Sequence, residues 1–158
     1  MKKILFFAAI FLLLLLALFL LSQTPAQPQK YALVNTPTSQ ITAKIADTDS
    51  SRALGLMHEH SLCSACGMLF VFPDSQVRYF WMKNTLIPLD MVFIYENFTV
   101  EGIRTAYPCG HDPCPLQPSA HAVKYVLEIN ANSSGALGIR EGTRLIATNL
   151  SSVGQIPP

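Results

Sequence analysis

A short polar cluster beside the only tryptophan is the first place in this sequence where chemistry is expected. Trp81 is followed closely by Lys83, Asn84 and Thr85, and Asp90 comes five residues later. A lysine and a carboxylate with a neighbouring amide and hydroxyl can bind an anionic or polyhydroxylated ligand, and the indole can serve as a stacking wall. The stretch pairs no nucleophile with a base, so it favours binding over catalysis. We therefore predict a ligand-binding rim at these five residues.

The same stretch also suits a structural role, which its spacing alone favours. Asn84 and Thr85 are turn residues because their side chains bond nearby backbone groups, and Pro88 fixes a φ angle. The indole of Trp81 would then anchor the core, and Asp90 would accept backbone N–H bonds. Both interpretations stay open at this point.

Four cysteines form a second cluster that could do chemistry. They are arranged as Cys63-x-x-Cys66 and as Cys109 and Cys114, with four residues between the latter two. In an exported domain, disulfides are the default. A bridge within either pair contributes about 2 kcal/mol in the chain-entropy model, whereas a bridge between the pairs closes about fifty residues and contributes about 4 kcal/mol. This comparison favours a cross-link between the two loops.

Two alternatives remain for these cysteines. Both spacings suit a tetrahedral zinc site with four thiolates, and His58, His60 and His111 lie nearby in the sequence. Thiol exchange at Cys63-x-x-Cys66 is the other alternative, although the strand–helix pattern of a thioredoxin-like domain is missing around it. With disulfides as the default no cofactor is expected, and zinc is the metal that the four cysteines could bind.

Asp90 and Glu128 are the carboxylates considered for acid–base chemistry. A hydrolase or a transferase could use either residue as a proton donor or acceptor. The pairing requires that the two carboxylates share a pocket, and opposite faces of the fold would remove it. We favour this hypothesis less than binding.

The chain opens with two lysines and a long apolar run. Lys2 and Lys3 precede residues 4–21, which are eighteen apolar residues without interruption. A bilayer core needs about 20 such residues, with a lower limit of about 17, so the run is just long enough to span it. The lysines would hold the N-terminus in the cytoplasm, and the rest of the chain would face outward. We predict a membrane anchor at 4–21, with a cleaved signal peptide and a secreted protein as the alternative.

Composition and charge limit the partners and the number of domains. Eleven basic and ten acidic residues give a net charge of +1, and the basic residues are scattered, so no nucleic-acid partner is expected. The residues after the apolar run suffice for one domain with a core. We divide the chain into an anchor or signal peptide (1–21), a linker (22–30), a β domain (31–150) and a tail (151–158).

Hydrophobic alternation predicts short strands and little helix. Strands are expected at 31–35, 41–46, 68–72, 77–82, 90–95, 98–106, 123–129 and 144–148. Pro73 is expected to end the third strand, the two strands that flank the polar cluster to form a pair, and Gly102 to mark a bulge. One short helix is expected at 49–57, with Asp47 or Asp49 as its cap.

These elements indicate a mainly β (β-rich α+β) fold. We expect a compact antiparallel barrel or sandwich with one or two short helices. In the strand at 123–129, the odd-numbered residues are expected to face inward, and Lys124 and Glu128 to face outward.

Five ordered blocks of the sequence resemble the DUF192 family, a prokaryotic family without an assigned activity. The blocks, within about residues 38–148, are RALGLM (52–57), GMLFVFP (67–73), FWMKNTLIPLDMVFI (80–94), AYPCGHDPC (106–114) and AVKYVLEINA (122–131). The resemblance implies a small β-rich domain, commonly behind an export signal or a membrane segment. By resemblance, the family's motif positions are held by Arg52, Trp81, Lys83, Asn84, Thr85, Pro88, Asp90, Lys124 and Glu128.

The resemblance adds Arg52 to the candidate ligand-binding residues. It also exposes a departure, because Thr143 stands where the family usually has an aspartate. The combined expectation is an exported, membrane-anchored module that binds a small polar ligand or a partner in the cell envelope.

Overall fold

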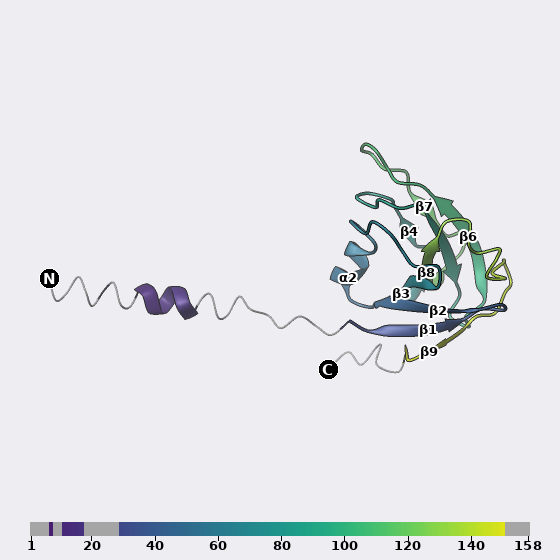
Figure 1. Ribbon diagram of the computed structural model, residues 1–158, viewed down its shortest axis with the longest axis horizontal. Helices are drawn as coiled ribbons and strands as arrows, with labels where there is room; N and C mark the ends of the chain where they lie inside the picture. The colour runs from purple at the N-terminus through teal and green to yellow at the C-terminus, as the bar shows by residue number, and fades with distance from the viewer. Residues whose placement is uncertain (1–6, 8–10, 18–28, 151–158) are drawn as a thin grey trace.

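A curved seven-stranded sheet dominates the structure (Figure 1). The structure is a computed structural model that describes residues 7, 11–17 and 29–150. Its elements, in chain order, are β1 (Tyr31–Asn35), β2 (Gln40–Ala46), α2 (Asp49–Leu54), β3 (Cys66–Gln76), β4 (Tyr79–Phe80), β5 (Leu89–Ile94), β6 (Val100–Ala106), β7 (Gln117–Pro118), β8 (Val123–Asn130) and β9 (Ile146–Thr148). The mainly β prediction is therefore confirmed.

The sheet is neither a closed barrel nor a sandwich, and it is not wholly antiparallel. Its strand order is β6-β5-β8-β3-β2-β1-β9, and β4 and β7 form a separate two-stranded ribbon. The pair β2–β3 is parallel, which is possible because α2 and the loop after it supply the long crossover that parallel strands need. Near the two edges, an isolated bridge joins Thr99 to Arg144, and backbone hydrogen bonds link Val100 to the segment before β9. In the part of the chain described, β6 and β9 do not pair as strands, so the sheet is not a closed barrel.

Both faces of the sheet are covered, which explains why all six residues of β5 are buried. One face packs Ala43, Ile45, Leu69, Val92, Leu127 and Ile129 into a first core. The other face packs Met68, Phe70, Met91, Phe93 and Val126 against Leu56 and Met82 in a second core. In Figure 1, α2 lies at one side of the sheet, while β4 and β7 lie on the side away from β1 and β9. A strand covered on both faces buries even its alternate residues.

One prediction for β8 is wrong because both faces of the sheet are covered. Glu128 was expected to face outward, yet only 5% of it is exposed. Its alternate position in the strand does point away from the first core, but the second core lies on that side. The predicted alternation of side chains along β8 is correct, but the face that carries Glu128 is covered by the second core and not by solvent.

Three local predictions are also corrected. β3 does not end at Pro73, because this proline falls in the irregular stretch between Val71 and Gln76, where the pairing with β8 shifts register. The strands that flank the polar cluster do not pair with each other: β4 pairs with β7, and β5 with β6 and β8. The cap of α2 is Thr48, whose hydroxyl accepts from the amide of Ser51.

The predicted bulge at Gly102 is confirmed, since the β5–β6 register shifts beside it. The predicted anchor at 4–21 lies mostly outside the described residues, of which 7 and 11–17 are helical. No helix among the described residues has the length and apolar character to span a bilayer.

Candidate functional site

The polar cluster around Trp81 forms a tight turn that separates two cavities. The amide of Thr85 donates to the carbonyl of Met82 at 3.2 Å, and Asn84 takes a left-handed φ of 55° that asparagine tolerates better than most residues. The carbonyl of Asn84 accepts from the amide of His58 at 2.9 Å, which ties the turn to the loop after α2. The turn prediction for Asn84 and Thr85 is thereby confirmed.

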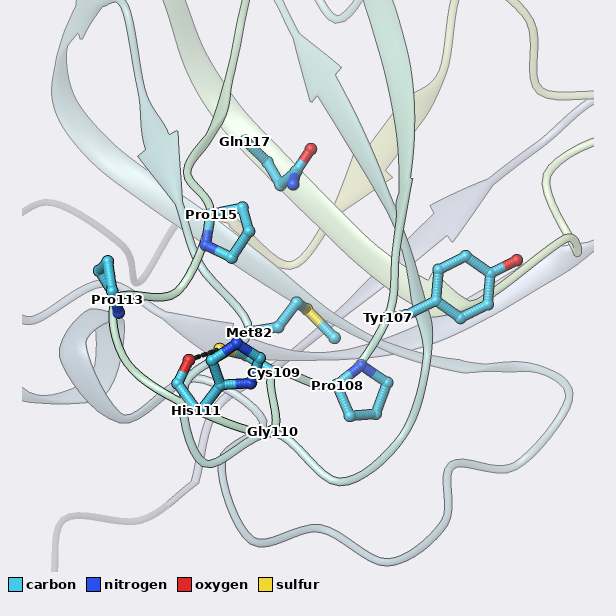
Figure 2. Close-up of a pocket in the computed structure, with 9 residues that line it drawn as sticks. All are labelled: Met82, Tyr107, Pro108, Cys109, Gly110, His111, Pro113, Pro115 and Gln117. Carbon is cyan, nitrogen blue, oxygen red and sulfur yellow. Dashed lines mark hydrogen bonds between the residues drawn. The ribbon is translucent and has the colours of Figure 1, made fainter.

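The first cavity, which we name the Met82 pocket, is open and has a volume of about 280 Å³. Its lining residues are Met82, Tyr107, Pro108, Cys109, Gly110, His111, Pro113, Pro115 and Gln117. Figure 2 shows Met82 in the middle of the group, with Tyr107 and Pro108 on one side and Pro113 and Pro115 on the other. The pocket thus has walls that are almost equally polar and apolar, and Tyr107, His111 and Gln117 supply polar side-chain atoms.

An exposed ion pair joins the turn to the loop that forms this pocket. The Nζ atom of Lys83 lies 2.9 Å from Oδ2 of Asp112, whose chain neighbours both line the pocket. Trp81 is 48% exposed, and Lys83 Nζ lies 5.8 Å from the centroid of its ring. Trp81 is therefore not the buried anchor that the structural interpretation expected.

The second cavity, which we name the Glu128 cavity, is small, with a volume of about 30 Å³. Its lining residues are Arg52, Ala53, Leu54, Gly55, Leu56, Met57, Phe70, Trp81, Thr85 and Glu128. It lies between α2, the loop that follows α2, the polar turn and β8. Three candidate ligand-binding residues, Arg52, Trp81 and Thr85, are therefore brought together around a buried glutamate.

Glu128 is the electrostatically unusual group of this structure. Among the described residues, no hydrogen-bond donor or cation is paired with its carboxyl group. Burial alone therefore acts on it, and it raises the pKa of Glu128 from 4.5 to about 8. A carboxyl group in this state is mostly protonated at neutral pH and can exchange its proton near that pH.

Arg52 does not neutralise this glutamate. Its guanidinium donates to the carbonyls of Asp47 (2.6 Å) and Val71 (2.8 Å) and to the carboxylate of Asp49 (2.6 Å). These bonds connect α2 to β3 and orient the charge of Arg52 toward them. Arg52 lines the cavity but serves mainly to hold α2 in place.

Asp90 does not lie on the rim with the other candidates. It is fully buried and accepts hydrogen bonds from the hydroxyl of Thr105 (2.7 Å) and from the amides of Asn132 (3.0 Å) and Ser134 (3.1 Å). Burial by itself would raise the pKa of Asp90, but these three hydrogen bonds outweigh it and hold the pKa below its usual value. The carboxylate joins β5, β6 and the turn after β8.

Asp90 and Glu128 cannot act as a catalytic pair, because they lie on opposite faces of the sheet. Asp90 is directly opposite Ile129, and Glu128 is opposite Met91. Directly opposed residues point to the same face and neighbours in a strand point to opposite faces. The paired acid–base hypothesis is therefore removed.

The cysteines form two local disulfides. Cys63 is bonded to Cys66 and Cys109 to Cys114, so the predicted cross-link between the loops is wrong. The chain-entropy model considers only how much a bridge restricts the unfolded chain. Which sulfur atoms come close enough to bond is decided by the fold. Each sulfur is bonded to another sulfur and offers no thiolate to zinc in this state. Within the described part of the chain, no group of three or more His, Cys, Asp or Glu residues is arranged to hold a metal ion.

Sequence reasoning missed Asp112 and Tyr107 as candidates. The only signal was the density of proline and cysteine in their loop, which predicts a constrained loop but not the turn that it meets. That contact is set by long-range packing, for example by the amide of Cys109, which donates to the carbonyl of Met82 at 3.5 Å.

Comparisons with known proteins agree with the fold. The DUF192 family, described as uncharacterized ACR, matches residues 32–147. A solved structure from Sinorhizobium meliloti, described as a proposed transcription regulator, is 33% identical with a TM-score of 0.68, and the match covers 78% of this chain and 97% of that one. A protein of unknown function from Novosphingobium aromaticivorans is 29% identical with a TM-score of 0.65, and the match covers 79% and 94%. No curated protein matches. Since the family match covers most of the chain, this chain belongs to the DUF192 family.

Proposed function

We propose that the domain is a binding module that takes a small polyhydroxylated ligand, such as a sugar, at the Met82 pocket. The observation that carries this proposal is the Lys83–Asp112 ion pair, which lies at the edge of a pocket with both polar and apolar walls and beside a half-exposed indole. Both side chains are partly exposed, and charges in contact with solvent gain little from each other, so both groups remain available to a ligand.

The lining of the pocket suits the two kinds of surface that a sugar presents. Its C–H faces can pack on Tyr107 and the prolines, because aromatic rings combine apolar area with a polar tip. Its hydroxyl groups can bond to His111, Gln117 and the ion pair, which together supply both donors and acceptors. The volume of about 280 Å³ is just under the range of about 300–1,000 Å³ typical of ligand pockets, so the ligand is small.

We propose further that the domain lies outside the cytoplasm, anchored to the membrane by residues 4–21. The support is the uninterrupted apolar run after Lys2 and Lys3. Two disulfides suit an oxidising compartment. A ligand from the cell envelope, free or carried by a partner, follows from this location. Fractionation with protease protection tests it, and recovery of the intact chain from the cytosol with reduced thiols would contradict it.

Two other roles have weaker support. Zinc binding or thiol exchange at the four cysteines is the alternative. Zinc binding first requires reduction of both bridges, whereas thiol exchange would begin with attack of an external thiolate on a bridge such as Cys63–Cys66. Thiol counting and metal analysis on protein isolated from its own cells would detect it.

We propose no nucleic-acid partner, although one structural neighbour is described as a proposed transcription regulator. The net charge of +1 provides no overall excess of basic residues to attract phosphates.

Thermal shift and calorimetric titration against a panel of sugars and anions test the pocket. Lys83→Ala and Tyr107→Ala should each weaken the response to a bound sugar. The first removes the ammonium group of the ion pair at the edge of the pocket, and the second removes an aromatic ring from its wall. Lys124→Ala is the matched control, since Lys124 pairs with Glu96 and does not line the pocket. If Lys83→Ala and Tyr107→Ala respond like the wild type, the pocket is not the site.

A further inference from the structure

We propose that the Glu128 cavity binds a small ammonium group, carried by the ammonium ion or by a primary amine. This site is separate from the Met82 pocket, because the two cavities share no lining residue. The starting observation is Glu128, a residue that is 95% buried, lines a cavity, and has no hydrogen-bond or ion-pair partner for its carboxyl group among the described residues.

Two of the polar side chains that line the cavity offer acceptor oxygens. The carboxylate of Glu128 is one, and Oγ1 of Thr85 is the other, since its hydroxyl is directed at the carbonyl of Lys83 at 3.4 Å. An ammonium group has donors and no acceptor, so it complements this lining. A ligand that itself offers acceptor atoms would form fewer hydrogen bonds with the same two groups.

The charge of Arg52 does not exclude a cation. Its guanidinium bonds to two backbone carbonyls and to the carboxylate of Asp49, which offsets its charge. Met68 and Met91 flank Glu128 on the neighbouring strands and carry no charge. Glu128 is thus left as the acid that a bound cation would pair with.

The next charged residues in the same row of the sheet are two strands from Glu128. Lys44 lies across β3 and pairs with Glu59 at 2.9 Å. Arg104 lies across β5, and its Nε donates to the carbonyl of Pro118 at 3.4 Å. Both cations therefore have partners of their own, and neither lines the cavity.

Size and walls also fit an ammonium group. A volume of about 30 Å³ matches one group of the size of a water molecule, and an ammonium ion has that size. The rings of Phe70 and Trp81 line the cavity, and aromatic rings attract cations. Leu54 and Trp81 are 57% and 48% exposed, so the cavity has lining residues that reach the surface and can admit a ligand.

The fluorescence of Trp81 tests this proposal, because Trp81 is the only tryptophan and lines the cavity. The full chain is titrated with ammonium chloride, and tetramethylammonium chloride serves as the control with equal charge and anion but a size that the cavity cannot hold. We expect a saturable change with ammonium alone. We expect Glu128→Gln to abolish it, and Glu96→Gln, which alters an exposed carboxylate, to retain it.

The pH dependence supplies a test that needs no variant. The glutamate must lose its proton to pair with the cation, so the affinity for ammonium should weaken about tenfold for each pH unit below about 8. Equal responses to the two cations, an unchanged response in folded Glu128→Gln, or an affinity that does not vary with pH below about 8 would each overturn the proposal.

Discussion

Glu128 should control how the stability of the domain depends on pH. Burial raises the pKa of Glu128 from 4.5 to about 8, so the folded protein holds a proton that the unfolded chain releases between these values. The free energy of unfolding therefore falls as the pH rises through this window. The contribution of the protonated acid is fully present below about pH 4.5 and is lost above about pH 8.

The size of the effect follows from the width of that window. A difference of about 3.5 units in pKa, at about 1.4 kcal/mol per unit, gives an upper limit of about 5 kcal/mol. Domains of this size are stable by about 5–15 kcal/mol in total, so the loss is large enough to measure by chemical denaturation.

The assay is urea unfolding followed by circular dichroism from about pH 5 to about pH 9, on the wild type, Glu128→Gln and Glu96→Gln. A neutral glutamine resembles the protonated acid, so Glu128→Gln should match the wild type at the acidic end. It should exceed the wild type by up to about 5 kcal/mol at the alkaline end. Glu96→Gln should follow the wild type throughout. Parallel curves for the wild type and Glu128→Gln would refute the reasoning, because they would mean that Glu128 does not titrate in this window.

Three further predictions follow from the geometry. Asp90→Asn removes a charged acceptor of three hydrogen bonds and should lower the free energy of unfolding by about 2–4 kcal/mol in urea. Because the pKa of Asp90 is lowered, its contribution should disappear as the pH falls below about 4. Gly67→Ala places a Cβ 2.7 Å from a backbone oxygen of β8 and should cost about 1–3 kcal/mol, whereas Gly102→Ala meets nothing within 4 Å and should not. Reduction of each disulfide should cost about 2 kcal/mol, because each joins residues only three or five positions apart, and peptide mapping that found a bridge between the loops would contradict the pairing.

Local pattern predicted most of the elements that position the site. The strand at 31–35 is confirmed, and the alternation that buries Ile41, Ala43 and Ile45 is confirmed in β2. The bulge at Gly102 and the turn at Asn84 were also predicted. These features depend on neighbours within a few residues, which is why the sequence alone reveals them.

The candidate site was predicted only in part. The proposed rim named the correct turn, but Asp90 and Thr85 turned inward while Trp81 and Lys83 remained at the surface. Spacing along the chain does not say on which side of the sheet each residue falls. The role of each as a ligand-binding residue stays a prediction.

The sequence by itself determined the β-rich composition, the strand periodicity and the family. The tertiary structure alone decided the parallel β2–β3 pair, the local disulfides and the burial of Glu128. Periodicity sets which residues share a face of a strand, because side chains alternate along it. What covers that face comes from distant parts of the chain, and for Glu128 it is α2, its following loop and the turn at Trp81. The property that sets Glu128 apart, a buried glutamate whose carboxyl group has no partner among the described residues, therefore exists only in the folded protein.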